Sequence, residues 1–147
     1  MSKSTIPQHV AIIPDGNRRW AKAQGLELFL GHEKGSKRFW EVSRVLSKAG
    51  TDFVTIWAAS VDNLTKRSNL EVNYLVRHAK REMRDQALIN EFIENEVRVR
   101  FVGKWNEILK DSELKELIEN LESKTENFTK KNITILFGYN GTDDMVE

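Results

Sequence analysis

The amino-acid sequence predicts an α/β protein in which a parallel sheet is flanked by helices. Four short runs rich in β-branched and apolar residues are spaced along the chain, and segments with apolar residues at helical spacing lie between them. Strands that alternate with helices of this length form βαβ crossovers, so we expect a parallel sheet covered by helices on both faces. The 147 residues show no repeat and no linker, and residues 1–147 are expected to form one domain.

One strand and two helices are expected in the first third of the chain. Residues 9–14 are mostly apolar, which is typical of a central parallel strand. A short helix is expected over 18–24, closed by Gly25. A longer helix is expected over 33–48, because an apolar stripe runs along it and a glycine follows: Phe39, Val42, Leu46 and Ala49, then Gly50.

The middle of the chain is expected to form strand, helix and strand. Residues 52–58 are again mostly apolar. One continuous helix is expected over 71–94, since apolar residues open it at helical spacing: Val72, Leu75, Val76, Ala79 and Met83. Residues 97–102 alternate valine with arginine, which indicates a strand with one wetter face.

A helix and a strand complete the predicted sheet. Asp111 or Ser112 is expected to cap a helix whose apolar stripe is Leu114, Leu117, Ile118 and Leu121. Residues 133–137 form the fourth strand, ended by Gly138. Thr142 or Asp143 then resembles a helix N-cap, with Met145 and Val146 starting an apolar face. Because the chain stops there, we expect the C-terminal part of the domain to be missing.

Composition excludes several classes of protein. The net charge of +1 gives no general electrostatic attraction to nucleic acid or anionic membranes. Without cysteine there are no disulfides, zinc–thiolate sites, iron–sulfur clusters or thiol nucleophiles. No apolar run approaches the ~20 residues of a membrane span and no signal-peptide core is present, so a cytoplasmic protein is expected. Residues 1–50 carry nine Lys and Arg against four acids, which indicates either a local phosphate site or a solvated basic helix face.

A polar cluster follows the first predicted strand, where ligands bind in parallel sheets. Gly16 permits a tight turn, and the next helix N-terminus offers N–H groups to an anion. Arg18 and Arg19 match phosphate geometry, and Asp15 can hold Mg²⁺. The alternative interpretation is a helix-capping Asp15, solvated arginines and Trp20 in the core.

A second cluster, residues 60–68, follows the second predicted strand and supplies a hydroxyl, a carboxylate, an amide and two cations. The alternative is a polar turn that caps the helix at Glu71. His32 is expected near the opening of the second helix, where it could donate to a phosphate or serve as an ordinary cap-region hydrogen bonder.

Residues 9–22, HVAIIPDGNRRWAK, resemble the signature of the cis-prenyltransferases, the undecaprenyl diphosphate synthase family. Residues 31–35, GHEKG, resemble the family's G-H-x-x-G motif. Residues 59–72 resemble its F-S-x-[ED]-N motif with the following Arg and Glu-Val. Residues 99–103 and 138–146 resemble its later strand and its N-Y-G-G motif. The resemblance extends from His9 to the last residue.

The resemblance implies head-to-tail condensation of isopentenyl diphosphate with an allylic diphosphate, which forms a cis double bond and releases diphosphate with Mg²⁺. It implies that Asp15 is the metal-binding catalytic carboxylate and that Asn63 lies beside the transferred proton. The implied substrate-binding residues are Gly16, Asn17, Arg18, Arg19, Trp20, His32, Ser60, Val61, Asp62, Leu64, and either Lys66 or Arg67. Candidates for the apolar tunnel of the growing chain, or for ordinary core, are Phe39, Val42, Leu75, Met83 and Phe92.

The chain departs from the family pattern in two ways that bear on function. Leu28 stands where the family often has an arginine, and the later segment that binds isopentenyl diphosphate and supplies much of the dimer contact is absent. For the full-length family member the resemblance implies a homodimer and membrane contact through the lipid product. No nucleic-acid partner is expected, because the net charge is near zero and no nucleic-acid-binding motif is present. The alternative is a truncated or non-catalytic homologue that binds a prenyl diphosphate or a partner subunit. An unrelated Asp-x-Asp phosphotransferase is excluded because Asn17 occupies the second carboxylate position.

Overall fold

The computed structural model describes residues 5–145, which form a four-stranded parallel sheet in the order β1-β2-β4-β3. The elements are β1 (His9–Ile12), α1 (Asn17–Ala23), α2 (Leu28–Ala49), β2 (Phe53–Ala59), α3 (Val61–Thr65), α4 (Asn69–Arg84), α5 (Gln86–Glu94), β3 (Val97–Val102), α6 (Trp105–Leu109), α7 (Ser112–Thr125), β4 (Lys131–Phe137) and a 3₁₀ turn (Asp143–Met145). The predicted fold class is confirmed, and all four predicted strands are present.

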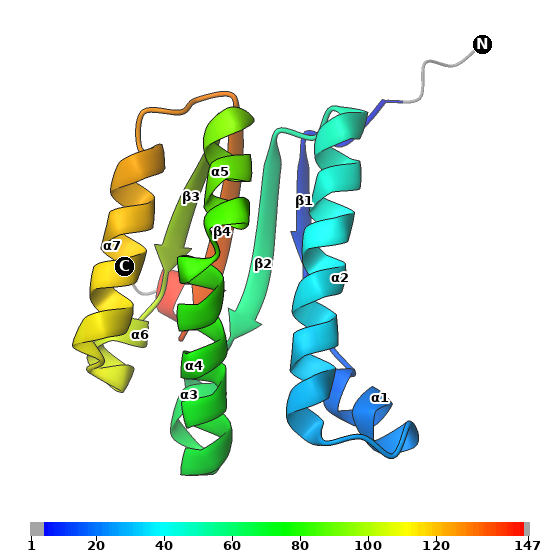
Figure 1. The fold of residues 1–147 in the computed structure, drawn as a ribbon, viewed down its shortest axis with the longest axis vertical. Coiled ribbons are helices and arrows are strands. Elements are labelled where there is room, and N and C mark those ends of the chain that lie inside the picture. Colours follow the sequence, from blue (N-terminus) through cyan, green and yellow to red (C-terminus); the bar gives the residue numbers. More distant parts are fainter. Residues whose placement is uncertain (1–4, 146–147) are drawn as a thin grey trace.

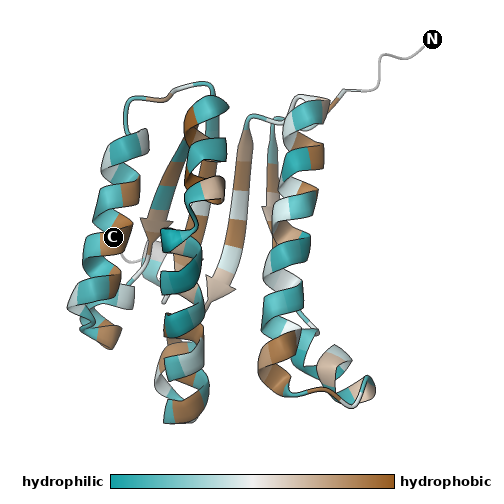
Figure 2. Ribbon diagram, viewed as in Figure 1, coloured by the Kyte–Doolittle hydropathy of each residue, from teal (hydrophilic) through white to brown (hydrophobic). Residues whose placement is uncertain are grey.

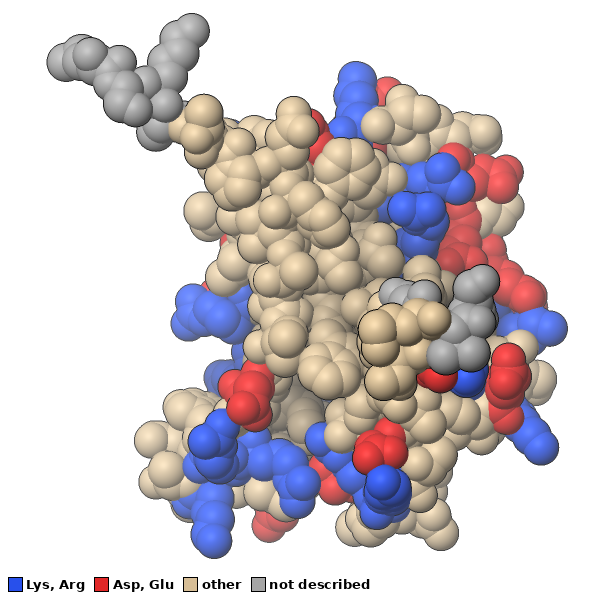
Figure 3. Space-filling view, turned by 180° about the vertical axis from the view of Figure 1, so that it is seen from behind, with Lys and Arg blue, Asp and Glu red and all other residues tan. Residues whose placement is uncertain are grey.

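The long helices α2, α4, α5 and α7 lie on one face of the sheet (Figure 1). The expectation of helices on both faces is therefore wrong for the residues that the structure describes. The strands alternate accordingly, because Val54 and Ile56 are buried against the helices whereas Phe53 and Trp57 on the same strand are exposed. Figure 3 shows this rear face, where few charged side chains lie over the strands and basic ones gather beyond their carboxyl ends.

The core lies between the sheet and its single helical layer, and the helices direct their apolar residues toward the strands (Figure 2). Leu114 and Ile118 of α7 have no exposed surface. The buried Thr125 hydroxyl accepts a hydrogen bond from the backbone N–H of Val99 at 3.1 Å and donates to the carbonyl of Leu121 at 3.0 Å. This hydroxyl ties α7 to β3 and satisfies an edge-strand N–H.

Several helix boundaries differ from those that periodicity predicts. The predicted helix 71–94 is two helices, because Asp85 adopts an extended backbone and its carboxylate accepts from the N–H groups of Ala87 and Leu88. The helix α2 begins at Leu28 rather than residue 33. The predicted C-terminal helix is a 3₁₀ turn as far as Met145, and Val146 lies outside the described residues.

Two features at the carboxyl ends of the strands position the site. The first strand ends at Ile12, two residues earlier than predicted, and α1 follows the turn after it. In β2 the register with β4 shifts between Trp57 and Ala59, so Ala58 is a bulge residue without a Cα partner. No helix within residues 5–145 combines the length and apolarity that crossing a membrane requires.

Candidate active site

The turn after β1 brings Asp15 and Arg19 into contact. The N–H of Asp15 donates to the carbonyl of Ile13 at 2.9 Å, and Gly16 then adopts a left-handed backbone with φ 91° at the N-cap of α1. One oxygen of Asp15 accepts from the N–H of Gly16 at 2.6 Å, and the other accepts from Nη2 of Arg19 at 3.0 Å. The carboxylate and the guanidinium group therefore face the same space.

The two glycines of the GHEKG segment allow α2 to pack closely on Asn17. A Cβ atom added at Gly31 would lie 2.2 Å from the backbone oxygen of Asn17, and one at Gly35 would lie 2.7 Å from its side-chain nitrogen. His32 follows Gly31 in the second turn of α2. The expectation that His32 opens this helix is wrong, because the helix starts four residues earlier, at Leu28.

The segment after β2 is a short helix rather than a polar turn. The expected cap at Glu71 is present, because the Ser68 hydroxyl accepts from the N–H of Glu71 at 3.3 Å. The Ser60 hydroxyl accepts from the N–H of Asn63 at 3.0 Å, and Oδ1 of Asn63 accepts from the N–H of Ser60 at 3.3 Å. This reciprocal capping box fixes both side chains at the N-terminus of α3. The carboxamide NH₂ of Asn63 keeps two donor hydrogens that the cap does not use.

Glu71 on α4 holds three cationic or titratable side chains together, and sequence reasoning missed its role. Its Oε1 accepts from Nη1 of Arg67 at 2.9 Å and lies 3.7 Å from both Nε of Arg18 and Nε2 of His32. Burial lowers the pKa of His32, the positive charge of Arg67 lowers it further, and Glu71 opposes both. His32 is therefore neutral near pH 7. The spacing of four residues between Arg67 and Glu71 was the available signal.

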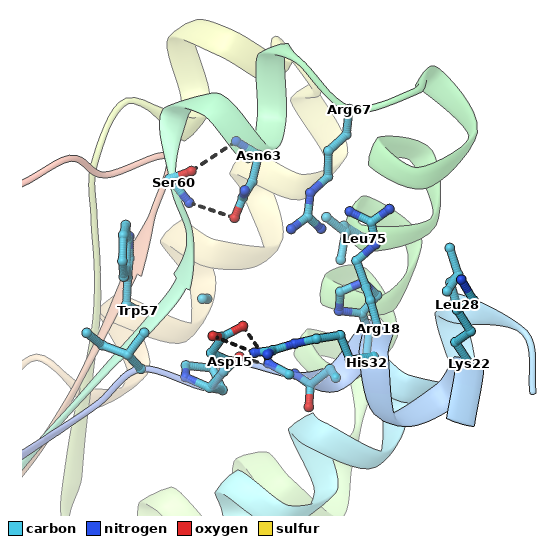
Figure 4. A pocket seen from close by; sticks show the side chains of 16 residues that line it. Asp15, Arg18, Lys22, Leu28, His32, Trp57, Ser60, Asn63, Arg67 and Leu75 are labelled. Carbon is cyan, nitrogen blue, oxygen red and sulfur yellow. Dashed lines mark hydrogen bonds and ion pairs between the residues drawn. The ribbon is translucent and has the colours of Figure 1, made fainter. Parts of the chain in front are cut away.

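These elements enclose a cavity of about 820 Å³, the outer cavity (Figure 4). It brings together nine of the predicted site residues: Asp15, Gly16, Asn17, Arg18, Arg19, His32, Ser60, Asn63 and Arg67. It also contains residues that the sequence reasoning did not assign to the diphosphate site: Lys22, Leu28, Trp57 and Leu75. Trp57 could have been found from its place at the carboxyl end of β2.

The other predicted site residues do not line this cavity. Trp20 is exposed on α1, and Leu64 is buried in the core. The N–H of Val61 donates to Oδ1 of Asn140 at 3.3 Å. Lys66 pairs with Asp62 at 2.8 Å on the surface, whereas the side chain of Arg67 is only 19% exposed and faces the cavity. Of the two cations that the sequence left as alternatives, the geometry favours Arg67.

The donors that face the outer cavity determine whether Mg²⁺ fits there. Within residues 5–145 no group of three or more His, Cys, Asp or Glu side chains forms a metal cage. Asp15 presents one carboxylate that is 80% exposed, surrounded by cations that suit phosphate. Mg²⁺ is commonly held by one or two carboxylates plus substrate phosphates, so this donor set fits Mg²⁺ that arrives with a diphosphate.

A smaller cavity of about 140 Å³, the inner cavity, adjoins the outer one. Both are lined by Pro14, Asn17, His32, Ala58 and Leu75. Of the tunnel candidates, Phe39, Leu75 and Met83 line the inner cavity and Phe92 lines a separate one beyond it. Val42 lines none of these three cavities and is 37% exposed on α2. A charged cavity thus continues into a mostly apolar one.

Comparison with known proteins identifies the family. The protein-family model described as "Putative undecaprenyl diphosphate synthase" matches residues 13–147 of the chain. The chain belongs to the undecaprenyl diphosphate synthase family. It is 37% identical over 143 residues to the tritrans,polycis-undecaprenyl-diphosphate synthase (geranylgeranyl-diphosphate specific) of Sulfurisphaera tokodaii, covering 97% of this chain and 53% of that protein. It is 35% identical over 147 residues to an isoprenyl transferase of Thermus thermophilus, covering 100% and 55%.

The family's fold is also present in a solved structure. The lavandulyl diphosphate synthase of Lavandula x intermedia, in complex with dimethylallyl diphosphate, matches with a TM-score of 0.87 and 28% identity, over 97% of this chain and 59% of that one. The resemblance that the motifs indicated is confirmed at the level of the undecaprenyl diphosphate synthase family. The chain spans about half the length of the curated relatives it matches.

Proposed function

We propose that the chain acts in a cis-polyprenyl diphosphate synthase, which condenses isopentenyl diphosphate with an allylic diphosphate, forms a cis double bond and releases diphosphate. One observation carries the proposal: Asp15 and Arg19 are in contact at the rim of a cavity that Asn63 and Arg67 also line. The family of prenyltransferases to which the chain belongs supports the same reaction class.

In this proposal the cationic side chains bind the diphosphate of the allylic substrate. Arg18, Arg19 and Arg67 supply guanidinium groups that pair with phosphate oxygens, and the N–H groups at the start of α1 add neutral donors. Neutral His32 contributes a further hydrogen bond. Because Glu71 holds Arg67 and His32 in place before substrate arrives, these two groups would stabilise the negative charge that develops on the leaving diphosphate.

Asp15 would hold Mg²⁺ together with the diphosphate, and Arg19 would then turn from Asp15 to the phosphate. When bound, Mg²⁺ would neutralise part of the negative charge of the leaving diphosphate. Asn63 would orient the part of the substrate that loses a proton when the double bond forms. The capping box with Ser60 holds the side chain of Asn63 in place. The inner cavity would accept the apolar tail.

The wider expectations for the full-length protein belong to the same proposal. They are a homodimer, a cytoplasmic location and peripheral membrane contact through the lipid product. The second candidate is a homologue that binds prenyl diphosphate without turnover, and the assay below separates the two.

The test is a condensation assay of the full-length protein, because activity of the 147-residue chain alone is doubtful without the segment that binds isopentenyl diphosphate. The assay uses labelled isopentenyl diphosphate, an allylic diphosphate and Mg²⁺, followed by analysis of the product. We expect a labelled cis-prenyl diphosphate, and a loss of at least roughly a hundredfold in Asp15→Asn. The matched control is Glu119→Gln on α7, which pairs with Lys115 on the surface. Binding of the allylic diphosphate without any product would support the second candidate, and failure to bind would contradict both.

A further inference from the structure

The inner cavity ends at a tryptophan. Trp40 on α2 lines the inner cavity and also a third cavity of about 230 Å³, the distal cavity, between α2, α5 and strands β3 and β4. Among residues 5–145, Trp40 alone lines both. Its indole ring therefore separates two spaces that lie one after the other along α2.

The indole ring of Trp40 packs against two aromatic rings, and its N–H group is hydrogen-bonded. Its centroid lies 4.8 Å from that of Phe39 and 5.5 Å from that of Phe92. Its N–H donates to Oε2 of Glu82 at 2.9 Å, and Oε1 of Glu82 accepts from the Ser36 hydroxyl at 2.7 Å. Moving the ring would break a charge-assisted hydrogen bond to a carboxylate whose side chain is 22% exposed.

The two sides of this ring differ in chemistry. Apolar side chains dominate the inner cavity, among them Phe39, Ile56 and Met83, and its polar members include His32, His78 and Glu82. In the distal cavity the Ser43 hydroxyl is buried without a hydrogen-bond partner, and Arg44 pairs with Glu91 at 2.6 Å. Polar groups form a larger share of the lining of the distal cavity than of the inner one, so an apolar tail matches the inner cavity better.

The inner cavity has room for a short tail. An apolar cavity of about 150 Å³ accommodates a benzene-sized molecule, so the volume of about 140 Å³ fits roughly one five-carbon isoprene unit. We propose that Trp40 is the specificity-determining stop for the prenyl tail, which lets about one isoprene unit enter beyond the outer cavity. This inference rests on the proposed function, because it takes the ligand to be a prenyl diphosphate.

The test is isothermal titration calorimetry of the 147-residue chain with Mg²⁺ and four diphosphates: dimethylallyl, geranyl, farnesyl and geranylgeranyl. For the unaltered chain we expect affinity to rise roughly tenfold from the C5 to the C10 ligand and by less than roughly threefold beyond it, since burial of each isoprene unit strengthens binding only while space remains. In Trp40→Ala we expect the rise to continue, roughly tenfold again, to the C15 or C20 ligand.

Trp40→Leu removes the ring but keeps an apolar side chain, and it serves as the second variant if alanine unfolds the protein. Val45→Ala on the same helix is the control, because Val45 is 66% exposed and lines neither cavity. The proposed role of Trp40 would be overturned if the affinity of the unaltered chain kept rising up to the C20 ligand. It would also be overturned if the Trp40 variants showed the same dependence of affinity on tail length as the unaltered chain. Absence of binding for all four ligands would instead refute the proposed function, and the stop with it.

Discussion

Nη1 of Arg67 lies 2.9 Å from Oε1 of Glu71, and the same oxygen lies 3.7 Å from groups on Arg18 and His32. Four side chains from α1, α2, the α3–α4 connection and α4 thus meet at one carboxylate oxygen. The cluster arranges the cations of the outer cavity and also contributes to stability, because Glu71 and Arg67 are each less than one-fifth exposed.

Glu71→Gln is expected to lower the free energy of unfolding by about 1–3 kcal/mol, because Arg67 loses its ionic partner in a partly buried position. Urea denaturation measures the change. Glu41→Gln is the control, because the Arg38–Glu41 pair is exposed and its loss should cost less than about 0.5 kcal/mol. Equal effects of the two substitutions would contradict the role given to Glu71.

Arg67→Ala and Lys66→Ala separate the two cations that the sequence left open. We expect Arg67→Ala to weaken binding of inorganic diphosphate with Mg²⁺ by at least roughly tenfold, because a guanidinium group facing the cavity is lost. Lys66→Ala should change the affinity by less than roughly twofold, because its ammonium group pairs with Asp62 outside the cavity. Calorimetric titration measures both, and the reverse order would assign the role to Lys66.

Gly31→Ala tests the close packing of α2 on α1. The added methyl group would meet the backbone oxygen of Asn17 at 2.2 Å, so the helices must move apart. We expect the free energy of unfolding to fall by about 1–3 kcal/mol in urea denaturation. Gly141→Ala introduces the same methyl group where no atom lies within 4 Å, and it should be nearly neutral. If both variants were equally stable, the two helices would not be in tight contact.

Stability is expected to fall as the pH drops below about 6.5. Burial lowers the pKa of His32 and of His78 from the value of 6.5. Between the lowered pKa and that of the unfolded chain, the unfolded state binds more protons, so the free energy of unfolding rises with pH. The contribution is complete above about pH 7 and declines through the acidic range. Urea denaturation at a series of pH values measures this slope, and His32→Gln should flatten it. A slope that His32→Gln leaves unchanged would contradict the assignment.

Patterns within one strand or one turn were sufficient to predict the sheet and the loop after β1. Apolar runs predicted three of the strands, and the alternation of valine with arginine predicted β3. The position of Asp15, Gly16 and Arg19 directly after the first strand placed these residues at the correct edge. Periodicity did not show the break at Asp85, because apolar spacing continues across it while the carboxylate caps a new helix. It also did not show that helices cover one face only, which depends on where each helix packs rather than on its own sequence.

The rest of the site depends on contacts between elements. Lys66 and Arg67 are neighbours in sequence, and only the end of α3 decides which one faces the cavity. Glu71 gains its role from Arg18 and His32, which lie on two other helices. Trp20 belongs to the most specific motif of the chain. It nevertheless does not line the outer cavity, because its position on α1 points its side chain elsewhere.

The bulge in β2 has a consequence for the width of the passage between the outer and inner cavities. Ala58, which has no Cα partner on β4, lines both cavities and is itself exposed. Any longer side chain at this position would narrow the passage between the outer and inner cavities, through which the proposed function requires an apolar tail to pass. Under the proposed function, the cross-section of the prenyl tail rather than the packing of the protein interior would limit which residues are tolerated at Ala58.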